Sequence, residues 1–337
     1  MRRVVYTDPA WALNDRGHPD LALADIERAA FGNDIELRLG LFDGRYMVQG
    51  REFHEYVRGA DAVVIYRCQV TPELLEAIGP TCRVVARSGV GIDNLNAPLL
   101  AAAGIASFNI PDYCVDEVST HTLAMLLALE RKVCTQDRLV KADQWNIHAG
   151  GVPRRVGACT AGIIGFGRIG RATARKLQAF YGRIIAYDPY VSADLMAGYG
   201  VTAATELTEL FATADAVVIH AALTAETDRL VDAAALSAAR PGALLVNTAR
   251  GRLVDPAAVL EALEAGRLGG FASDVFTPED PNADPTARKL VPREDVVVSS
   301  HRAFLSVESE RSCRRRIAEG VAGVLAGGPP PAEGRVT

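Results

Sequence analysis

Three charged or titratable residues follow apolar runs in the second half of the chain. Arg250 follows the run "ALLVN", Glu279 follows "GFASDVF", and His301 follows "DVVVSS". A histidine can take or give a proton near neutral pH, and a carboxylate on its other ring nitrogen would fix the tautomer and favour the imidazolium. An arginine can bind a substrate carboxylate and polarise a carbonyl without losing its own proton. Together these residue types suit hydride transfer to or from a 2-hydroxy acid, with His301 moving the proton.

Each of these residues also fits a structural role when it is considered alone. Arg250 could form a surface ion pair, and Glu279 could be an acidic loop residue. His220 ends another apolar run, "VVIH", and such histidines also occur as hydrogen-bonded structural groups. The other histidines have no partner pattern, and we expect them to be structural or exposed: His18, His54, His121 and His148. The catalytic interpretation therefore depends on the three residues meeting at one edge of a sheet.

A glycine cluster earlier in the chain indicates a phosphate-binding turn. Gly165, Gly167 and Gly170 fit the pattern G-x-G-x-x-G between an apolar run and a helix-forming stretch. The first glycine permits a tight turn, the second lets a pyrophosphate approach the backbone, and the third lets the helix pack on the strand. Arg168 and Ile169, which open the helix, complete the expected cofactor-binding turn.

An aspartate after the next apolar run bears on the choice of cofactor. The run "RIIAY" ends at Asp188. A carboxylate here can accept hydrogen bonds from the adenosine ribose hydroxyls and would repel a 2′-phosphate. The pattern therefore predicts NAD rather than NADP, with Thr248 after "ALLVN" as a further cofactor contact. The alternative is a structural turn followed by a surface aspartate.

Short β-branched runs alternate with helix-forming stretches, which is typical of parallel sheets with crossover helices. Five runs come first: "RVVYT", "DIELRL", "DAVVIY", "CRVVARSG" and "IASFNI". After a long helix expected at 113–131, six more follow: "TAGIIGFG", "GRIIAYD", "DAVVIH", "GALLVN", "GGFASDVF" and "DVVVSS". The sequence thus predicts an α/β protein with two doubly wound parallel-sheet domains. Its Pro- and Gly-rich end is expected to be disordered beyond about residue 326.

Composition and charge argue against several other functions. The 337 residues give room for about two domains, and 49% apolar residues suffice for their cores. A net charge of −5 and the lack of a long basic stripe argue against nucleic acid as a partner, and the basic cluster 311–316 is expected to be a solvated helix face. No apolar run is long enough to cross a bilayer, so we expect no membrane partner and a cytoplasmic location. The six cysteines include no C-x-x-C pair, and no metal site is predicted.

The order of these motifs resembles that of the D-isomer-specific 2-hydroxyacid dehydrogenases. The motifs are "GFGRIG", Asp188, "NTARGRLVD", "SDVFTPED" and "SSHRAF", within a resemblance that extends from about residue 35 to 325. It implies that a Rossmann NAD-binding domain, residues 108–301, is inserted into a flavodoxin-like substrate domain of residues 1–107 and 302–337. It also implies a homodimer formed through the NAD-binding domain.

The resemblance assigns roles to the arginine, glutamate and histidine that follow the apolar runs. It makes His301 the acid and base, Glu279 its carboxylate partner and Arg250 the substrate anchor. It places Asp274, from "SDVFTPED", near the nicotinamide amide.

A second stretch resembles the substrate-binding loop of the family. In "SGVGIDN", Gly89 would turn the chain tightly, and the backbone N–H groups of Val90 and Gly91 would meet the substrate carboxylate. Our hypothesis is that a second anionic group of the substrate, such as a phosphate or phosphonate, binds at least one of three arginines: Arg67, Arg87 and Arg302. Surface or interdomain ion pairs are an equally good explanation of these arginines.

The residues around His301 depart from the commonest family pattern. The usual proline before the histidine is Ser300, and Phe304 falls where members similar to the C-terminal-binding-protein branch carry a large aromatic residue. Phe304 would favour an apolar substrate side chain. Because some members of that branch are NAD-sensing scaffolds, two functions follow from the resemblance. One is an NAD-dependent dehydrogenase acting on a small D-2-hydroxy acid, and the alternative is an NAD(H)-sensing binding protein with little turnover.

Overall fold

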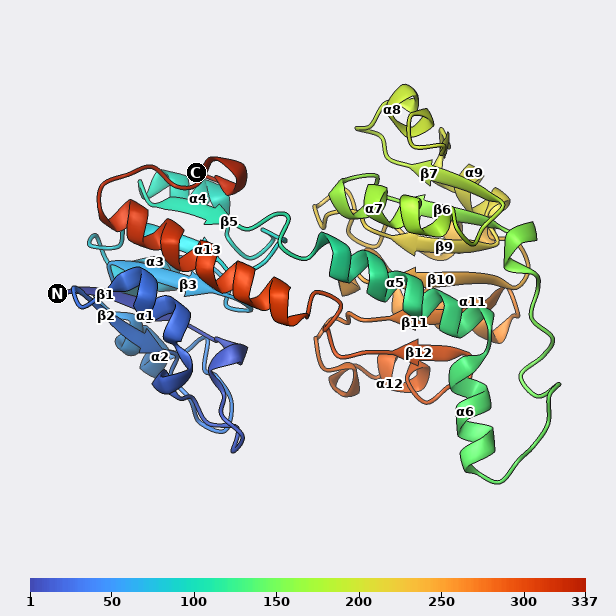
Figure 1. Cartoon of the computed structure of the whole chain (residues 1–337), viewed down its shortest axis with the longest axis horizontal. Coiled ribbons are helices and arrows are strands. Elements are labelled where there is room, and N and C mark those ends of the chain that lie inside the picture. Colours follow the sequence, from blue (N-terminus) through green and yellow to red (C-terminus); the bar gives the residue numbers. More distant parts are fainter. The chain divides into compact units, whose positions relative to one another are not determined.

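The computed structural model describes the whole chain, residues 1–337, as two compact units (Figure 1). One unit comprises Met1–Tyr113 and Ser306–Thr337, and the other comprises Cys114–Leu305. The second unit is therefore an insertion in the sequence of the first. The sequence predicted boundaries at residues 107 and 302, and the observed boundaries lie a few residues later, after Tyr113 and after Leu305.

The first unit contains a five-stranded sheet in which all neighbouring strands are parallel. The strand order β2-β1-β3-β4-β5 is that of flavodoxin-like domains. The predicted fold class is thus confirmed for this unit. The strands are β1 (Arg2–Tyr6), β2 (Ile35–Leu39), β3 (Ala62–Ile65), β4 (Val84–Arg87) and β5 (Ala106–Asn109).

Alternate residues of these strands face two separate cores, because successive side chains point to opposite faces of a sheet. Val4 and Val64 face the core that includes residues of α1 (Asp25–Phe31) and α13 (Val307–Leu325). Val5 and Val63 face the core on the other side. That core includes residues of the remaining helices, α2 (Arg51–Val57), α3 (Pro72–Ile78) and α4 (Ala97–Ala102). Helices therefore cover both faces of the sheet, with α1 and α13 side by side in Figure 1.

A buried ion pair attaches α13 to the N-terminal part of the first unit. The Arg314 guanidinium donates to Glu27 Oε2 at 2.7 Å and lies 3.9 Å from the centroid of the Trp11 ring. Both charged side chains are buried, so a break in the pair would leave an uncompensated charge. The expectation that the basic cluster 311–316 is only a solvated helix face is therefore wrong at Arg314.

The C-terminal segment is ordered, which corrects the expectation of disorder beyond about residue 326. Phe108 and Arg335 form an antiparallel bridge, and the Val336 N–H donates to Ser107 O at 2.9 Å. The physical reason is that β5 is the edge strand of its sheet. Its outer backbone groups would otherwise lack protein partners, and the returning chain satisfies some of them.

The second unit contains a seven-stranded parallel sheet with the order β12-β11-β10-β9-β6-β7-β8. Its first strand, β6, lies between β9 and β7, which is the doubly wound order expected of a Rossmann domain. Six strands were expected, and the seventh is the two-residue β8 at the sheet edge. The strands are β6 (Thr160–Ile164), β7 (Arg183–Tyr187), β8 (Thr202–Ala203), β9 (Ala216–Ile219), β10 (Ala243–Asn247), β11 (Leu268–Ser273) and β12 (Val296–Val298).

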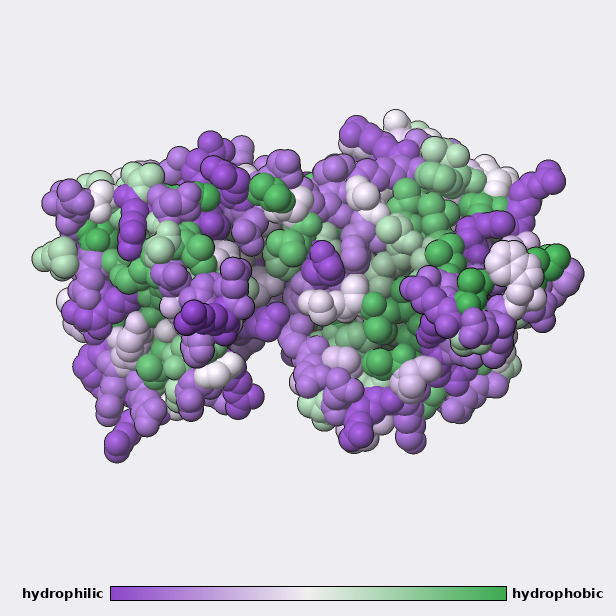
Figure 2. All heavy atoms as spheres, turned by 60° about the horizontal axis from the view of Figure 1, so that its bottom comes forward, coloured by the Kyte–Doolittle hydropathy of each residue, from purple (hydrophilic) through white to green (hydrophobic).

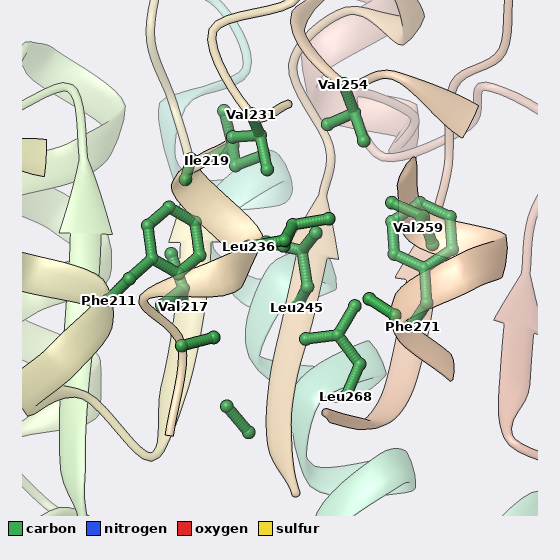
Figure 3. Packing of buried hydrophobic residues seen from close by; sticks show 14 of the residues in the cluster. Phe211, Val217, Ile219, Val231, Leu236, Leu245, Val254, Val259, Leu268 and Phe271 are labelled. Atoms are coloured by element: carbon green, nitrogen blue, oxygen red, sulfur yellow. The ribbon is translucent and has the colours of Figure 1, made fainter. Parts of the chain in front are cut away.

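Helices also cover both faces of this second sheet. Figure 3 shows one core, in which Phe211, Leu236 and Val259 from three helices surround Leu245 of β10. The opposite core includes Leu126 of α5 and Leu177 of α7. The helices are α5 (Val115–Glu130), α6 (Val133–Lys141), α7 (Arg168–Leu177), α8 (Ala193–Ala197), α9 (Leu207–Thr213), α10 (Ala233–Ser237), α11 (Pro256–Glu264) and α12 (Ala287–Leu290).

Short 3₁₀ turns complete the secondary structure. They lie at Ala10–Ala12, Leu21–Leu23, Val156–Ala158, Gly251–Leu253, Pro281–Ala283 and Ala332–Gly334. None of the helices combines the length and apolar character that a membrane crossing requires.

Candidate active site

The glycine-rich turn joins β6 to α7 in the second unit. Gly165 has φ of +88°, and a Cβ atom there would lie 2.5 Å from the backbone nitrogen of Ala221. A Cβ atom at Gly170 would lie 2.1 Å from Gly165 O, so the helix packs directly on the turn. At Gly167 a Cβ atom would meet no other atom within 4 Å. The turn is thus closed on the protein side and open at its second glycine, where a phosphate can approach the backbone.

The start of α7 supplies hydrogen-bond donors beside this opening. Gly167 precedes the helix, and Arg168 and Ile169 are its first residues. The first N–H groups of a helix have no partner within the helix, and they favour a bound anion. The sequence prediction named these residues as a cofactor-binding turn, and their positions suit that role.

Asp188 follows β7 and is bonded to the glycine-rich turn. Its Oδ2 accepts the Phe166 N–H at 2.8 Å, and its Oδ1 accepts the Tyr190 N–H at 2.9 Å. These bonds fix the carboxylate, while each oxygen keeps capacity to accept another donor. A ribose hydroxyl fits that capacity. The sequence showed the aspartate but gave no sign of its bond to Phe166.

His220, at the end of β9, has a structural role. Its Nε2 lies 2.9 Å from Thr173 Oγ1 of α7. Desolvation by burial lowers the pKa of the imidazole to about 3, so His220 stays neutral at physiological pH. The sequence left open a structural role for this histidine at a strand end, and its contacts agree with that role.

The three residues with acid, base and anchoring chemistry follow three adjacent strands. Arg250 follows β10, Glu279 follows β11 and His301 follows β12, and the sheet order is β12-β11-β10. Because the strands are parallel, their carboxyl ends share one edge of the sheet. Ligands of doubly wound domains bind outside that edge.

His301 and Glu279 form a hydrogen-bonded pair. His301 Nδ1 lies 2.9 Å from Glu279 Oε2 and 3.0 Å from Oε1. The His301 side chain is 19% exposed, and that of Glu279 is 43% exposed. The carboxylate engages Nδ1, so Nε2 is the ring nitrogen left for proton exchange with a substrate.

A buried carboxylate holds the turn that carries His301. Asp274 Oδ1 accepts the Arg302 N–H at 3.0 Å and the Ser299 hydroxyl at 2.5 Å, and Oδ2 accepts the Ala303 N–H at 2.8 Å. Asp274 O accepts the His301 N–H at 2.7 Å. His301 itself has φ of +53°, a region that non-glycine residues seldom adopt. Asp274, which the resemblance places near the nicotinamide amide, thus positions the histidine in this structure.

Helix α5 contacts two of these loops through polar side chains. His121 Nε2 lies 3.0 Å from Ser299 Oγ and 3.7 Å from Asp274 Oδ1. Thr122 Oγ1 lies 2.7 Å from the hydroxyl of Thr248, which is buried. In the sequence, His121 shows no partner pattern, and Ser299 was not among the predicted site residues. Its place directly after β12, two residues before the histidine, was the available signal.

The Arg250 turn is organised by Asn247, the last residue of β10. Asn247 Oδ1 accepts the Ala249 N–H at 3.0 Å, and its Nδ2 donates to Arg250 O at 2.8 Å. Arg250 Nη1 donates to Ala249 O at 2.9 Å. Asn247 was overlooked in the sequence, although asparagine commonly bonds to the backbone of a turn in this way.

In the first unit, the loop expected to bind substrate has two occupied carbonyl groups, those of Gly89 and Val90, and two free N–H groups, those of Val90 and Gly91. Gly89, with φ of +147°, accepts the Ile110 N–H through its carbonyl at 3.2 Å. Val90 O accepts Asn109 Nδ2 at 2.5 Å. The N–H groups of Val90 and Gly91 donate to no group of the chain. Such N–H groups suit a bound carboxylate.

Two arginines lie against Tyr66 at the same end of the first sheet. The guanidinium carbons of Arg67 and Arg87 are 5.4 and 5.3 Å from the centroid of the Tyr66 ring. Arg67 is exposed and Arg87 is buried.

The backbone of Arg67 is held from both sides. Asp8 accepts the N–H groups of Tyr66 and Arg67 at 3.0 and 2.6 Å. Asn94 Nδ2 donates to Tyr66 O at 3.0 Å and to Cys68 O at 2.9 Å. Asp8 and Asn94 were not singled out in the sequence.

The remaining sequence-predicted residues lie beside His301 in the second unit. Phe304 makes an edge contact with the His301 ring, with centroids 6.2 Å apart. Arg302 is exposed, and its N–H is bonded to Asp274. No three His, Cys, Asp or Glu side chains of the chain are grouped so that they could hold a metal ion.

Comparison with known proteins places the chain in a family. The model of the NAD-binding domain of D-isomer specific 2-hydroxyacid dehydrogenases matches residues 123–303, more than half of the chain. The chain belongs to this family. The resemblance seen in the sequence is thus confirmed, and the open glycine-rich turn and the Asp188 carboxylate fit the NAD that such a domain binds.

Relatives within the family carry different names. A D-3-phosphoglycerate dehydrogenase of Mycobacterium tuberculosis is 32% identical over 308 residues, which are 90% of this chain and 56% of that protein. The chain therefore spans about half the length of the curated relatives it matches. The D-lactate dehydrogenase of Escherichia coli is 25% identical, with a TM-score of 0.80 over 98% of this chain and 99% of that chain. The Aquifex aeolicus D-lactate dehydrogenase, solved with NAD and lactic acid, is 24% identical, with a TM-score of 0.84 over 97% and 96% of the chains.

The lowered pKa of His220 predicts how the stability of the fold depends on pH. Unfolded histidine has a pKa of about 6.5, whereas that of folded His220 is about 3. Below pH 6.5 the unfolded chain binds a proton that the folded chain does not. Protonation of the unfolded chain therefore does not reduce the free energy of unfolding above pH 6.5. The free energy of unfolding decreases as the pH falls from 6.5 towards 3, and the loss is about 2 kcal/mol at pH 5.

Urea unfolding at pH 7.5 and pH 5.0 measures this difference. His220→Gln should remove that part of the pH dependence, whatever its effect on stability at pH 7.5. His148→Gln, at an exposed position, is the control and should leave the dependence unchanged. If the free energy of unfolding falls equally between pH 7.5 and pH 5.0 in the native chain and in His220→Gln, the prediction is wrong.

Proposed function

We propose that the protein is an NAD-dependent oxidoreductase that interconverts a small D-2-hydroxy acid and its 2-oxo acid. The observation that carries this proposal is the His301–Glu279 pair, which follows strands of the same sheet as the dinucleotide turn. Arg250 follows the strand next to that of Glu279. Membership of the family supports the same reaction class.

The proposed proton transfer uses His301. Bound NAD would supply the hydride acceptor for oxidation of the hydroxy acid, and bound NADH would supply the hydride donor for the reverse direction. His301 removes the hydroxyl proton during oxidation and returns a proton to the carbonyl oxygen during reduction. Glu279, at 2.9 Å from Nδ1, stabilises the imidazolium that results from proton removal. Asp274 contributes by holding the His301 turn.

The proposed substrate contacts come from charged groups and backbone groups. Arg250 binds the carboxylate and polarises the carbonyl of the 2-oxo acid. The N–H groups of Val90 and Gly91, after the turn at Gly89, act as carboxylate donors. Phe304, which contacts the His301 ring, limits the substrate side chain.

NAD is proposed over NADP because of Asp188. Its carboxylate is fixed by the N–H groups of Phe166 and Tyr190. A 2′-phosphate would meet this negative charge, whereas a ribose hydroxyl can donate to it. The Gly165, Gly167 and Gly170 turn, Arg168, Ile169 and Thr248 are proposed as the other cofactor contacts, together with Asp274.

Turnover by the native chain and by His301→Ala tests the function. NADH oxidation would be followed with glyoxylate, hydroxypyruvate, 3-phosphohydroxypyruvate, phosphonopyruvate, pyruvate and 2-oxo-4-methylthiobutyrate. We expect turnover of at least one of these acids, and a drop in kcat of about 10³-fold in His301→Ala, as for the loss of a general acid. His148→Ala should retain full activity.

Tight NADH binding without turnover of any of the six acids would contradict the dehydrogenase proposal. That result would favour the alternative of an NAD(H)-sensing binding protein. Activity that survives in His301→Ala would contradict the role given to this residue.

We further propose that the substrate carries a second anionic group, a phosphate or phosphonate, and that Arg67 receives it. Arg67 forms no ion pair with any residue of the chain, and Asp8 and Asn94 hold its backbone. An exposed cation held in this way suits an anionic ligand. The name D-3-phosphoglycerate dehydrogenase of the M. tuberculosis relative points in the same direction.

Separate Arg67→Ala and Arg302→Ala variants test this second contact. Arg67→Ala should raise KM for 3-phosphohydroxypyruvate by about tenfold, the loss of one charge-assisted hydrogen bond, and leave KM for pyruvate or glyoxylate unchanged. Arg302→Ala is the matched control. Equal changes in KM for phosphorylated and simple acids would rule out a phosphate contact at Arg67.

A homodimer through the second unit is also proposed. It is supported by five exposed apolar side chains on α6 and the segment after it: Val133, Val140, Trp145, Ile147 and Val152. Figure 2 shows hydrophobic residues among the hydrophilic ones on the face of this unit that it draws. Exposed apolar groups of this kind are typical of an interface. The cytoplasmic location stays a prediction from the sequence.

Sedimentation measures the oligomeric state. The native chain should sediment as a dimer, and Trp145→Glu should shift it towards the monomer because a charge would be buried in the interface. Leu195→Glu, at another exposed apolar position of the same unit, should leave the dimer intact. A native monomer at micromolar concentration would contradict the proposal.

A further inference from the structure

A large aromatic side chain extends into solvent beside the dinucleotide turn. Tyr190, in the loop after β7, is 82% exposed. Its backbone is nevertheless anchored, because its N–H donates to Asp188 Oδ1 at 2.9 Å. Its hydroxyl donates to Glu226 Oε2 at 2.8 Å. The ring is therefore held at both ends although little of it is packed against protein.

The partner of Tyr190 comes from the other side of the turn. Glu226 lies in the loop after β9, and the sheet order is β9-β6-β7. The hydrogen bond thus joins the loops of the two strands that flank β6. The glycine-rich turn begins directly after β6. The turn and the two loops therefore all begin at the carboxyl edge of the sheet. A side-chain bridge therefore connects the two sides of the crevice where doubly wound domains bind dinucleotides.

The Glu226 end of the bridge is also ordered. Thr224 Oγ1 accepts the N–H groups of Glu226 and Thr227 at 3.2 and 3.3 Å. Thr227 Oγ1 donates to Ala222 O at 2.7 Å. Both loops thus have fixed backbones, so formation of the bridge costs little loop entropy.

We propose that Tyr190 and Glu226 form a clasp that retains the adenosine half of the bound dinucleotide. The proposal rests on the NAD binding described above. Asp188 is the expected partner of the adenosine ribose, and the clasp begins two residues beyond it. An exposed tyrosine ring offers a flat face on which a purine base can stack. The bond to Glu226 fixes the orientation of that ring.

The electrostatics of the pair keep the clasp closed over the working pH range. The hydrogen bond to the Glu226 carboxylate, and its charge, raise the pKa of the Tyr190 hydroxyl above its ordinary value. The hydroxyl therefore stays protonated and remains a donor. The nearby carboxylates of Glu226 and Asp188 also make this side of the crevice unsuitable for a further phosphate.

Binding and release of the cofactor halves test the clasp without reliance on catalysis. NADH release would be followed by stopped-flow fluorescence, and titration calorimetry would use ADP-ribose and reduced nicotinamide mononucleotide as probes of the two halves. Tyr190→Phe and Glu226→Ala should each speed NADH release and weaken ADP-ribose binding by about fivefold, the effect of one lost hydrogen bond. Binding of the mononucleotide should not change.

Two further variants make the result specific to the bridge. The Tyr190→Phe, Glu226→Ala double variant should show no loss beyond that of either single variant, because both remove the same bond. Tyr46→Phe loses a comparable hydroxyl bond, to Pro9 O in the first unit, and should behave as the native chain.

The outcomes separate this proposal from that of the dehydrogenase. If the native chain oxidises NADH and the Tyr190 and Glu226 variants release it at the native rate, the clasp is wrong and the proposed function stands. Tighter ADP-ribose binding in Tyr190→Phe would also overturn the clasp, since it would show that the pair obstructs the site. Failure of the native chain to bind NADH or ADP-ribose would overturn both proposals.

Discussion

The arrangement around His301 depends on the buried carboxylate of Asp274. A carboxylate that is 1% exposed destabilises the fold unless donors replace the water it has lost. The N–H groups of Arg302 and Ala303 and the Ser299 hydroxyl supply these donors, and all three come from the stretch that carries the histidine. The need to satisfy one buried charge thus holds that stretch in a single conformation. It also maintains the left-handed backbone of His301, which would otherwise be unfavourable.

The parallel sheet explains why distant parts of the sequence can share one reaction. β10, β11 and β12 are neighbours, so the loops after them begin at the same edge. Each loop is then fixed by hydrogen bonds from one side chain, which we call its brace. Asn247 is the brace of the Arg250 turn, and Asp274 is the brace of the His301 turn. Helix α5 adds a common support, because His121 contacts Ser299 and the next residue, Thr122, contacts Thr248. The positions of the chemical groups are therefore set by polar contacts made on a rigid apolar framework.

The sequence predicted those features that depend on local pattern. Alternating apolar runs predicted both sheets, and the positions of His301, Glu279 and Arg250 in the loops after strands predicted them as a set. It did not reveal the braces, because the bond from Ser299 to Asp274 links different loops and leaves no periodic signal. The ordered tail was missed for a similar reason. Its composition is that of a disordered segment, and only the unpaired edge of β5 explains why Val336 binds there. The two-residue β8 is too short to produce a pattern at all.

Two histidines show what a motif can and cannot establish. His220 and His301 both follow apolar strands of the same sheet, and the sequence offers similar evidence for each. Their partners differ: His220 faces a threonine hydroxyl, whereas His301 faces a carboxylate. Burial keeps the first neutral, because no charge compensates for its desolvation. A carboxylate beside the second can stabilise the cation that proton transfer creates. Both histidines follow strands of one sheet, so their position cannot distinguish a structural histidine from one that transfers protons. The group that contacts the imidazole ring makes that distinction.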